Sequence, residues 1–423
     1  MNTESDKSQC PVSGDRPLFP DYDPLAPDNK QDPWPILAKA RREQPVFWMP
    51  QLQMYCVTRY EDVRTIQKDS RTYSNVGANF MRVPLPEGLE IPPGCPFPSV
   101  GESVANADGK VHKRLRKLMQ PTFSRPAVAP FAPQIEKIAN DLIDDFIADG
   151  KADLVSQFAN KMAMRTIAAV LGFAVEDSAK FRAWTDQFLL LMGTPDMGED
   201  EARTLWSGLI DWYLYIQDMI QDRRKNPQND LVSALMAPPE DESIAPLTDE
   251  EIAANIIAFI VAGTDTTAIY ITQTVRLLHR EGLWQSVVED RSQLERIMEE
   301  TLRHTGVVRG LNRVTTCDTE LSGVKIPAGS TIYWMGASAN RDEEHFEDPD
   351  RFDPDRKNVF EHVAFSAGPH FCMGAPLARL EAKIAFNAIF DRLPTLRIPE
   401  QEVEFQPNFI TPTPKRLLVE WDL

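Results

Sequence analysis

The chain has 423 residues, a formal net charge of −18 and a composition that is 42% hydrophobic and 26% charged. These values are typical of a globular protein whose core is large enough to enclose a cofactor. The acidic balance argues against nucleic-acid binding, because phosphates require a basic surface. The longest apolar run, residues 253–263, is shorter than the ~20 residues of a membrane span. The first residues, MNTESDKSQC, lack the layout of a signal peptide, so we expect a cytoplasmic protein with no membrane partner.

The first hundred residues predict short elements and one long loop. Residues 1–34 are expected to form an extended lead-in, because proline and aspartate are frequent from residue 11 onward. A helix is predicted at residues 35–44, a strand at 51–58 and a helix at 60–69. Six prolines among residues 84–98 exclude a helix or a central strand there. A loop of this length in a compact domain is often a lid, and the apolar residues that favour this interpretation are Phe80, Met81, Val83, Leu85, Leu89 and Ile91.

Residues 108–305 are predicted to be almost entirely helical, with breaks near residues 124–133, 149–152, 193–199 and 226–246. A capping box, Thr248 with Glu251, begins one segment that is apolar on all sides around residues 256–261. This pattern predicts a long helix through the core. After Arg309 the pattern changes to short strands and then to an irregular stretch, DPDRFDPDR. Because no linker or repeat divides the chain, residues 35–423 are predicted to form one domain, mainly α with a small β region.

The most informative motif surrounds Cys372, one of five scattered cysteines that we expect to be reduced thiols. Glycines on both sides leave room for a large flat group, and a helix is predicted to begin just after the cysteine. The amides and dipole of a helix N-terminus lower the pKa of a thiol, which favours a metal-binding thiolate. The alternatives are a buried structural cysteine, a zinc site with His362 and His370, and a Cys–His hydrolase with His370.

A second motif, residues 262–267, places Gly263 and polar residues inside the apolar helix. Glycine is unfavourable there, and threonine can bend a helix by bonding to a preceding carbonyl. An acid beside an alcohol, Asp265 and Thr266, is able to relay protons to a buried oxidant. The alternative is a packing notch between helices with a satisfied Asp–Thr pair.

Two further motifs are weaker when taken alone. Glu300 and Arg303 share one helix face at spacing i,i+3, although most such pairs are solvated surface charges. His112 and Arg116 share a face at spacing i,i+4. The lysines near them suggest either a docking patch or a solvated helix face.

Taken together and in this order, the motifs resemble those of the cytochrome P450 superfamily of haem-thiolate monooxygenases, in its soluble bacterial form. The similarity covers about residues 35–423 and implies a haem b between a long central distal helix and a proximal cysteine loop followed by a helix. Cys372 would be the axial ligand of the haem iron. The other residues that the resemblance places around the haem are His112, Arg116, Ala262, Gly263, Arg313, Phe365, Gly368, His370 and Gly374. Glu300, Arg303 and Arg356 would form a buried structural network.

The resemblance also implies an O₂-activating reaction. Thr266 would hold the hydrogen bond to the bound oxygen while Asp265 gates protons. Two electrons from NAD(P)H would come through a separate ferredoxin or flavodoxin with its reductase, since no flavin or iron–sulfur motif follows the haem region. A basic patch would receive this partner, namely Lys110, Lys113, Arg114, Lys117 and Arg379.

The substrate is expected to be small and hydrophobic, aromatic or terpenoid, and to undergo hydroxylation or O-dealkylation. The residues that the resemblance places around it are Phe80, Met81, Val83, Phe188, Ile257, Ile260, Val307, Val308 and Ile410. After Arg303 the chain reads HTGVVRGLNR, where relatives commonly carry a proline-containing turn. Three alternatives stay open: an isomerase or dehydratase that does not activate O₂, a peroxide-using enzyme and a non-catalytic haem protein. A monomer is the family default.

Overall fold

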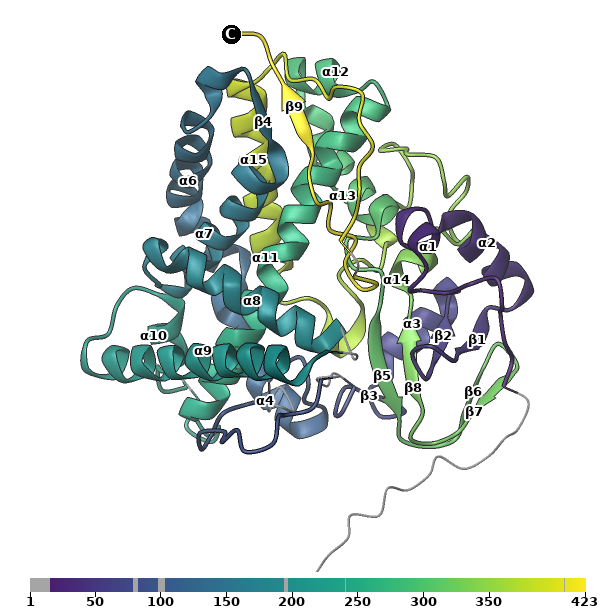
Figure 1. The fold of residues 1–423 in the computed structure, drawn as a ribbon, viewed down its shortest axis with the longest axis vertical. Helices are drawn as coiled ribbons and strands as arrows, with labels where there is room; N and C mark the ends of the chain where they lie inside the picture. Colours follow the sequence, from purple (N-terminus) through teal and green to yellow (C-terminus); the bar gives the residue numbers. More distant parts are fainter. Residues whose placement is uncertain (1–15, 79–82, 98–102, 194–196, 240, 407) are drawn as a thin grey trace, which may run out of the picture.

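The computed structural model describes residues 16–78, 83–97, 103–193, 197–239, 241–406 and 408–423. Helices dominate, and a smaller part rich in strands lies on one side (Figure 1). The predicted class, mainly α with a small β region, is confirmed. Its α-helices are α1 (Pro27–Gln31), α2 (Trp34–Glu43), α3 (Tyr60–Lys68), α4 (Gly109–Met119), α5 (Arg125–Val128), α6 (Ala132–Asp144), α7 (Asn160–Leu171), α8 (Ser178–Gly193), α9 (Glu199–Lys225), α10 (Leu231–Leu235), α11 (Asp249–Arg280), α12 (Trp284–Glu289), α13 (Leu294–Thr305), α14 (Gly336–Ala339) and α15 (Ala375–Arg392).

The largest sheet has the strand order β1-β2-β8-β5-β3. Strand β2 pairs with β1 in antiparallel and with β8 in parallel orientation. Two smaller sheets pair β4 with β9 and β6 with β7. The strands are β1 (Val46–Met49), β2 (Met54–Val57), β3 (Tyr73–Ser74), β4 (Lys151–Asp153), β5 (Leu311–Thr315), β6 (Thr319–Leu321), β7 (Val324–Ile326), β8 (Thr331–Trp334) and β9 (Leu418–Glu420).

Helix α11 passes through the middle of the helical part and packs against α7, α13 and α15 (Figure 1). Its predicted capping box is present: the Thr248 hydroxyl accepts the Glu251 N–H at 3.2 Å, and the Glu251 carboxylate accepts the Thr248 N–H at 3.0 Å. Its length and apolar composition alone would permit a membrane span, but 67% of its most apolar 18-residue window is buried inside the protein. Its apolar character is therefore that of a core helix.

Two sequence predictions need correction. The lead-in is not extended throughout, because residues 27–31 form α1, and Phe19 and Tyr22 are buried with their rings 5.4 and 5.9 Å from that of Phe47. The predicted break at residues 226–246 contains α10, which the Asp230 side chain caps by accepting the Ser233 N–H. Helix α10 buries Leu231, Val232 and Leu235, so it gains its stability from packing that the local sequence does not reveal.

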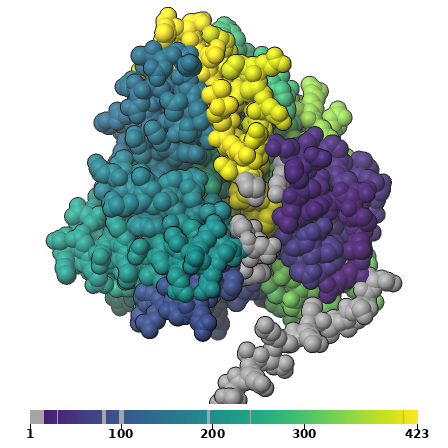
Figure 2. Space-filling view, viewed as in Figure 1, coloured from purple at the N-terminus to yellow at the C-terminus, as the bar shows by residue number. Residues whose placement is uncertain are grey.

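The C-terminal segment runs across the surface between the helical part and the N-terminal part (Figure 2). The loop between Val83 and Phe97 follows α8 and α9. The Val83 N–H donates to the Leu191 carbonyl, the Trp206 indole donates to the Pro84 carbonyl, and the Tyr213 hydroxyl donates to the Pro93 carbonyl. These contacts hold the loop against α9 and against α8, which lines the cavity described next.

Candidate active site

A cavity of about 470 Å³ lies where α11, the loop before α15 and the loops after α13 and before β9 meet. This volume is within the ~300–1,000 Å³ of typical small-molecule and cofactor sites. Its lining is mostly apolar, and it reaches from Cys372 on one side to Ala262 and Thr266 on the other. The cavity therefore brings together the two strongest motifs of the sequence, which lie about a hundred residues apart.

Cys372 lies three residues before the start of α15, and its N–H donates to the Phe365 carbonyl at 2.8 Å. Burial raises the pKa of the Cys372 thiol, while hydrogen bonds from the Gly374 and Ala375 amides act in the opposite direction. The sequence argument named the helix N-terminus correctly as a stabiliser of the thiolate. It left out the cost of burying a charge, which acts against the thiolate as long as no metal cation is bound.

Gly368 serves a different purpose from the one expected. Its φ is +68°, and a Cβ there would lie 2.8 Å from the Gln67 carbonyl oxygen and 2.9 Å from the Lys68 Cα. Glycine is thus required for close packing of the cysteine loop on the end of α3. Gly368 does not line the cavity, whereas Phe365 and Gly374 do.

Helix α4 is tied to the cysteine loop by several polar contacts. The guanidinium of Arg116 donates to the carbonyls of Pro369 and Phe371, both at 2.8 Å. The His112 ring lies 4.0 Å from that of His370, which in turn lies 3.0 Å from Asp108. Asp108 was missed by the sequence analysis, because its partner is 262 residues away.

These donors fit an anionic group at the edge of the cavity. His112 is 4% exposed, and its Nε2 has no hydrogen-bond partner within the described ranges. Burial lowers the pKa of His112 to about 4, with the neighbouring His370 and Arg116 acting in the same direction. Arg116 and Arg313 line the cavity, and burial lowers the pKa of Arg313 to about 10. Positively charged donors and an unsatisfied buried nitrogen suit the carboxylates of a porphyrin.

On α11, Ala262, Gly263, Asp265 and Thr266 all line the cavity. The Thr266 hydroxyl donates to the Ala262 carbonyl at 2.6 Å, although α11 remains one continuous helix through this region. Asp265 is 6% exposed, and its Oδ1 accepts a hydrogen bond from Arg182 of α8 at 2.6 Å. The sequence analysis missed Arg182 because it lies 83 residues away.

Arg182 is shared between two carboxylates. It also contacts Asp186, one turn further along α8, at 2.5 and 3.1 Å. Burial lowers the pKa of Arg182, but Asp265 and Asp186 outweigh this effect and raise it, so the guanidinium stays charged. It therefore links α8 to the middle of α11.

Most of the predicted substrate contacts lie on the cavity wall: Phe188, Ile257, Val307, Val308 and Ile410. Val83 and Ile260 do not, and these two predictions were wrong. Val83 is buried beside α8, and Ile260 lies about 200° around α11 from Ala262, on the side that packs in the core. Phe80 and Met81 lie outside the described residues. Leu189, Met192 and Thr411, in segments that the resemblance also places around the pocket, line the cavity as well, and so does Phe409, which was not predicted.

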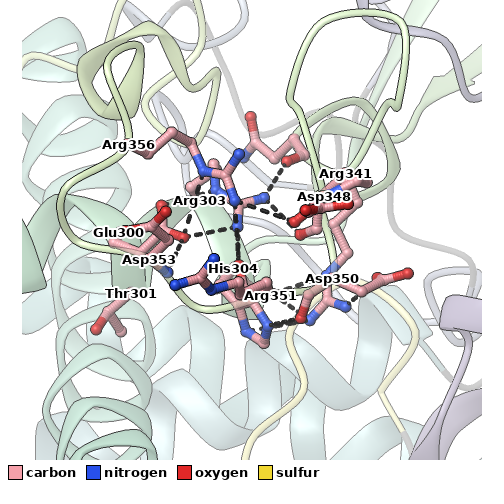
Figure 3. A network of polar contacts seen from close by, with 12 residues as sticks. Glu300, Thr301, Arg303, His304, Arg341, Asp348, Asp350, Arg351, Asp353 and Arg356 are labelled. Atoms are coloured by element: carbon pink, nitrogen blue, oxygen red, sulfur yellow. Dashed lines mark hydrogen bonds and ion pairs between the residues drawn. The ribbon is translucent and has the colours of Figure 1, made fainter. Parts of the chain in front are cut away.

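Glu300 and Arg303 form a buried ion pair with both side chains 0% exposed. The two contacts between guanidinium and carboxylate are 2.8 and 2.7 Å long. Arg303 also donates to the carbonyls of Asn340, Pro349 and Arg351, and Arg356 lies 3.6 Å from the Glu300 carboxylate (Figure 3). The alternative of a solvated surface pair is therefore excluded.

Three members of the predicted basic patch are already paired. Arg379 binds Glu299, Arg114 binds Glu251, and Lys117 lies 3.0 Å from Asp241. Within the described ranges, Lys110 and Lys113 have no ion-pair partner. The patch is consequently smaller than the run of basic residues suggests.

Comparison with known proteins agrees with this geometry. The family model for cytochrome P450 matches residues 45–421. The chain is 35% identical to cytochrome P450 107B1 of Saccharopolyspora erythraea over 352 residues, 82% of this chain and 84% of that protein. It is 32% identical to the monooxygenase PikC of Streptomyces venezuelae over 410 residues, 95% and 94% of the two chains. A solved structure of CYP109E1 from Bacillus megaterium in complex with testosterone superposes with a TM-score of 0.82 at 27% identity and covers 94% of this chain and 100% of that one. The chain therefore belongs to the cytochrome P450 family and is a haem-thiolate monooxygenase with haem b as its cofactor.

Proposed function

We propose that the protein inserts one oxygen atom from O₂ into a small, neutral, hydrophobic substrate, by hydroxylation or O-dealkylation. The observation that carries this proposal is the cavity itself, whose largely apolar wall joins Cys372 to the face of α11 that bears Ala262 and Thr266. When bound, the haem supplies the iron on which dioxygen is activated. The protein would contribute binding, orientation and proton transfer.

Cys372 would hold the haem iron through its sulfur. Burial disfavours a free thiolate there, and a metal cation reverses this balance because it deprotonates a coordinating thiol. Three residues at the cavity edge, Arg116, Arg313 and His370, together with His112 beside it, would bind the haem carboxylates. Each is a hydrogen-bond donor or a cation, and Arg116 and His370 are held in place by bonds to the cysteine loop and to Asp108.

Thr266 and Asp265 would deliver protons on the opposite side. The Thr266 hydroxyl donates its hydrogen to the Ala262 carbonyl. The lone pairs of the hydroxyl oxygen therefore remain available to accept a hydrogen bond from a donor in the cavity. Asp265 is held by Arg182, and Arg182 keeps a second carboxylate, Asp186, when it releases Asp265. Arg182 is thus a positioning residue for the acid that exchanges protons with solvent.

The substrate would fill the part of the cavity between α8 and the loops at residues 307–308 and 408–411. Phe188, Met192, Val308 and Ile410 provide a wide apolar wall there. Such a wall favours a rigid hydrophobic body, aromatic or terpenoid. The complex of the similar CYP109E1 with testosterone supports a ligand of this class.

Electrons would reach the haem from NAD(P)H through a ferredoxin or flavodoxin and its reductase. Lys110 and Lys113 provide the cationic contacts that an acidic carrier requires. We further propose that the enzyme acts in the cytoplasm as a monomer.

The experiment combines the purified protein with surrogate redox partners and a substrate library. Candidate substrates are those that displace a haem-bound water and shift the spin state. A monooxygenase consumes NAD(P)H and O₂ and forms product with them. Product without O₂ consumption would instead indicate an isomerase or dehydratase, product only with added peroxide a peroxide-using enzyme, and no product from any ligand a non-catalytic haem protein.

A further inference from the structure

A second, largely buried ion cluster lies beside the cysteine loop, on a face of α13 next to that of the pair that the sequence predicted. Glu299 precedes Glu300, and its side chain is 3% exposed. Arg379 of α15 grips its carboxylate with two contacts of 2.7 and 2.6 Å. The third member, His362, places its Nε2 3.1 Å from the same carboxylate.

The cluster is electrically neutral as a whole. The His362 Nδ1 accepts the Ala364 N–H at 3.2 Å, so the proton of the ring is on Nε2 and is donated to Glu299. His362 is therefore uncharged, and Glu299 and Arg379 cancel each other. Burial raises the pKa of Glu299, but the hydrogen bonds from Arg379 and His362 outweigh this and hold it at about 2, so the carboxylate is ionised at neutral pH.

The cluster contacts the cysteine loop directly. The guanidinium carbon of Arg379 lies 4.5 Å above the ring of Phe365, in cation–π contact. The carbonyl of Phe365 accepts the Cys372 N–H at 2.8 Å. One short path thus leads from Glu299 through Arg379 and Phe365 to the cysteine backbone. Arg379 is also close enough for its charge to oppose the rise in the Cys372 pKa.

We propose that Glu299, His362 and Arg379 are positioning residues that set the electrostatic potential at Cys372 and thereby the reduction potential of the bound haem. This inference rests on the proposed role of Cys372 as the haem ligand. Under this proposal, Arg379 supports the cysteine loop electrostatically and does not serve as a contact for the redox partner. Adding an electron to the iron is favoured by a nearby positive charge and opposed by a nearby negative one. Because the charges of Glu299 and Arg379 are paired, they hold the reduction potential between the values that either charge alone would give.

The test is a spectroelectrochemical titration of the haem-loaded protein and four variants. Arg379→Gln leaves Glu299 uncompensated, so we expect the ratio of reduced to oxidised haem at the wild-type midpoint to fall roughly tenfold, which is about 59 mV for a one-electron couple. Glu299→Gln leaves Arg379 uncompensated, and the ratio should rise by a similar factor. The double variant removes both charges and should return to within about twofold of the wild type. Lys383→Gln, an exposed position on the same helix, is the matched control and should not shift.

Shifts of opposite sign with recovery in the double variant would support the proposal, because a purely structural network would give two defects of the same kind and a worse double variant. Shifts of the same sign, or none beyond the control, would overturn it. If Arg379→Gln loses haem, Glu299→Gln decides alone, since glutamine keeps the shape of the side chain, and an unshifted potential in it overturns the proposal. A wild-type protein without thiolate-ligated haem would mean instead that the proposed function has failed.

Discussion

Two regions of the molecule each join a carboxylate to an arginine, and they do so in opposite ways. Asp265 has a single contact with Arg182, whose side chain is 32% exposed and is shared with Asp186. Glu300 and Arg303 are 0% exposed, are joined by two contacts, and Arg303 also binds three backbone carbonyls. When the first pair opens, Arg182 retains Asp186 and solvent, and Asp265 is left facing the cavity. The pair of Glu300 and Arg303 stays closed, because opening it would leave both charges buried without a counter-ion.

The comparison shows how position determines what an ion pair does. A buried pair with every donor satisfied is costly to break, since removing one partner leaves an uncompensated charge. A pair whose arginine is partly exposed and already contacts a second carboxylate costs less to separate. Proton delivery by Asp265 requires a pair that can separate, whereas holding α13 to residues 340–353 requires a pair that stays buried and fully bonded.

The largest expected effect comes from breaking the buried pair. Glu300→Ala should lower the free energy of unfolding by about 3–5 kcal/mol, because Arg303 would keep its charge without a counter-ion. Urea denaturation of the haem-loaded protein measures this loss. Lys137→Ala, which removes an exposed i,i+4 partner of Asp141, is the control and should stay within ~0.5 kcal/mol of the wild type. A Glu300→Ala protein as stable as this control would show that the buried pair gives no support.

The next effect separates Asp265 from Arg182. Asp265→Asn should lower the rate of product formation by on the order of a hundredfold, which is typical for loss of a proton-transfer group. Arg182→Ala should lower it by less than about threefold, because the acid remains and only its orientation is lost. Turnover in H₂O and in D₂O measures both, and the solvent isotope effect should increase in Asp265→Asn. Equal losses in the two variants would contradict the distinction between proton donor and positioning residue.

A smaller effect tests Thr266. Thr266→Ala should keep haem and substrate binding but lower the fraction of NAD(P)H that yields product roughly tenfold, the value of one hydrogen bond of about 1.4 kcal/mol. The lost electrons should be recovered as hydrogen peroxide. Thr264→Ala is the matched control, because its hydroxyl makes the same kind of bond to a preceding carbonyl but lies in the core and not on the cavity wall. Unchanged coupling in Thr266→Ala would remove this residue from the proton path.

The smallest effect concerns the redox partner. Lys113→Gln should slow haem reduction about two- to fivefold at low salt, and Lys117→Gln should do so less, because Asp241 already neutralises Lys117. The difference should vanish at high ionic strength, where exposed charges are screened. Stopped-flow reduction at two salt concentrations measures it. Reduction rates that respond to neither substitution would place the partner elsewhere.

Sequence reasoning succeeded where a feature is encoded by local spacing. The capping box of α11 and the pairing of Glu300 with Arg303 follow from positions three residues apart on one helix. The helix after Cys372 follows from the apolar pattern of its residues. These features depend on the geometry of a single helix, which the sequence specifies directly.

It failed where the feature joins distant segments. Arg182 meets Asp265, Asp108 meets His370, and Glu299 meets Arg379 across 83, 262 and 80 residues respectively. Nothing in the sequence marks which arginine will find which carboxylate. The wrong predictions have the same origin: Ile260 faces the core because of how α11 is rotated against its neighbours, and Arg379 is paired with Glu299 because α15 packs against α13.

The central claim is that Cys372 holds the haem iron. The most direct measurement is the absorption spectrum of the purified protein, reduced with dithionite and exposed to carbon monoxide, for the wild type and for Cys372→Ala. We expect a strongly red-shifted Soret band in the wild type that is absent from the variant. A spectrum without haem, or an imidazole-like band that Cys372→Ala leaves unchanged, would contradict the account.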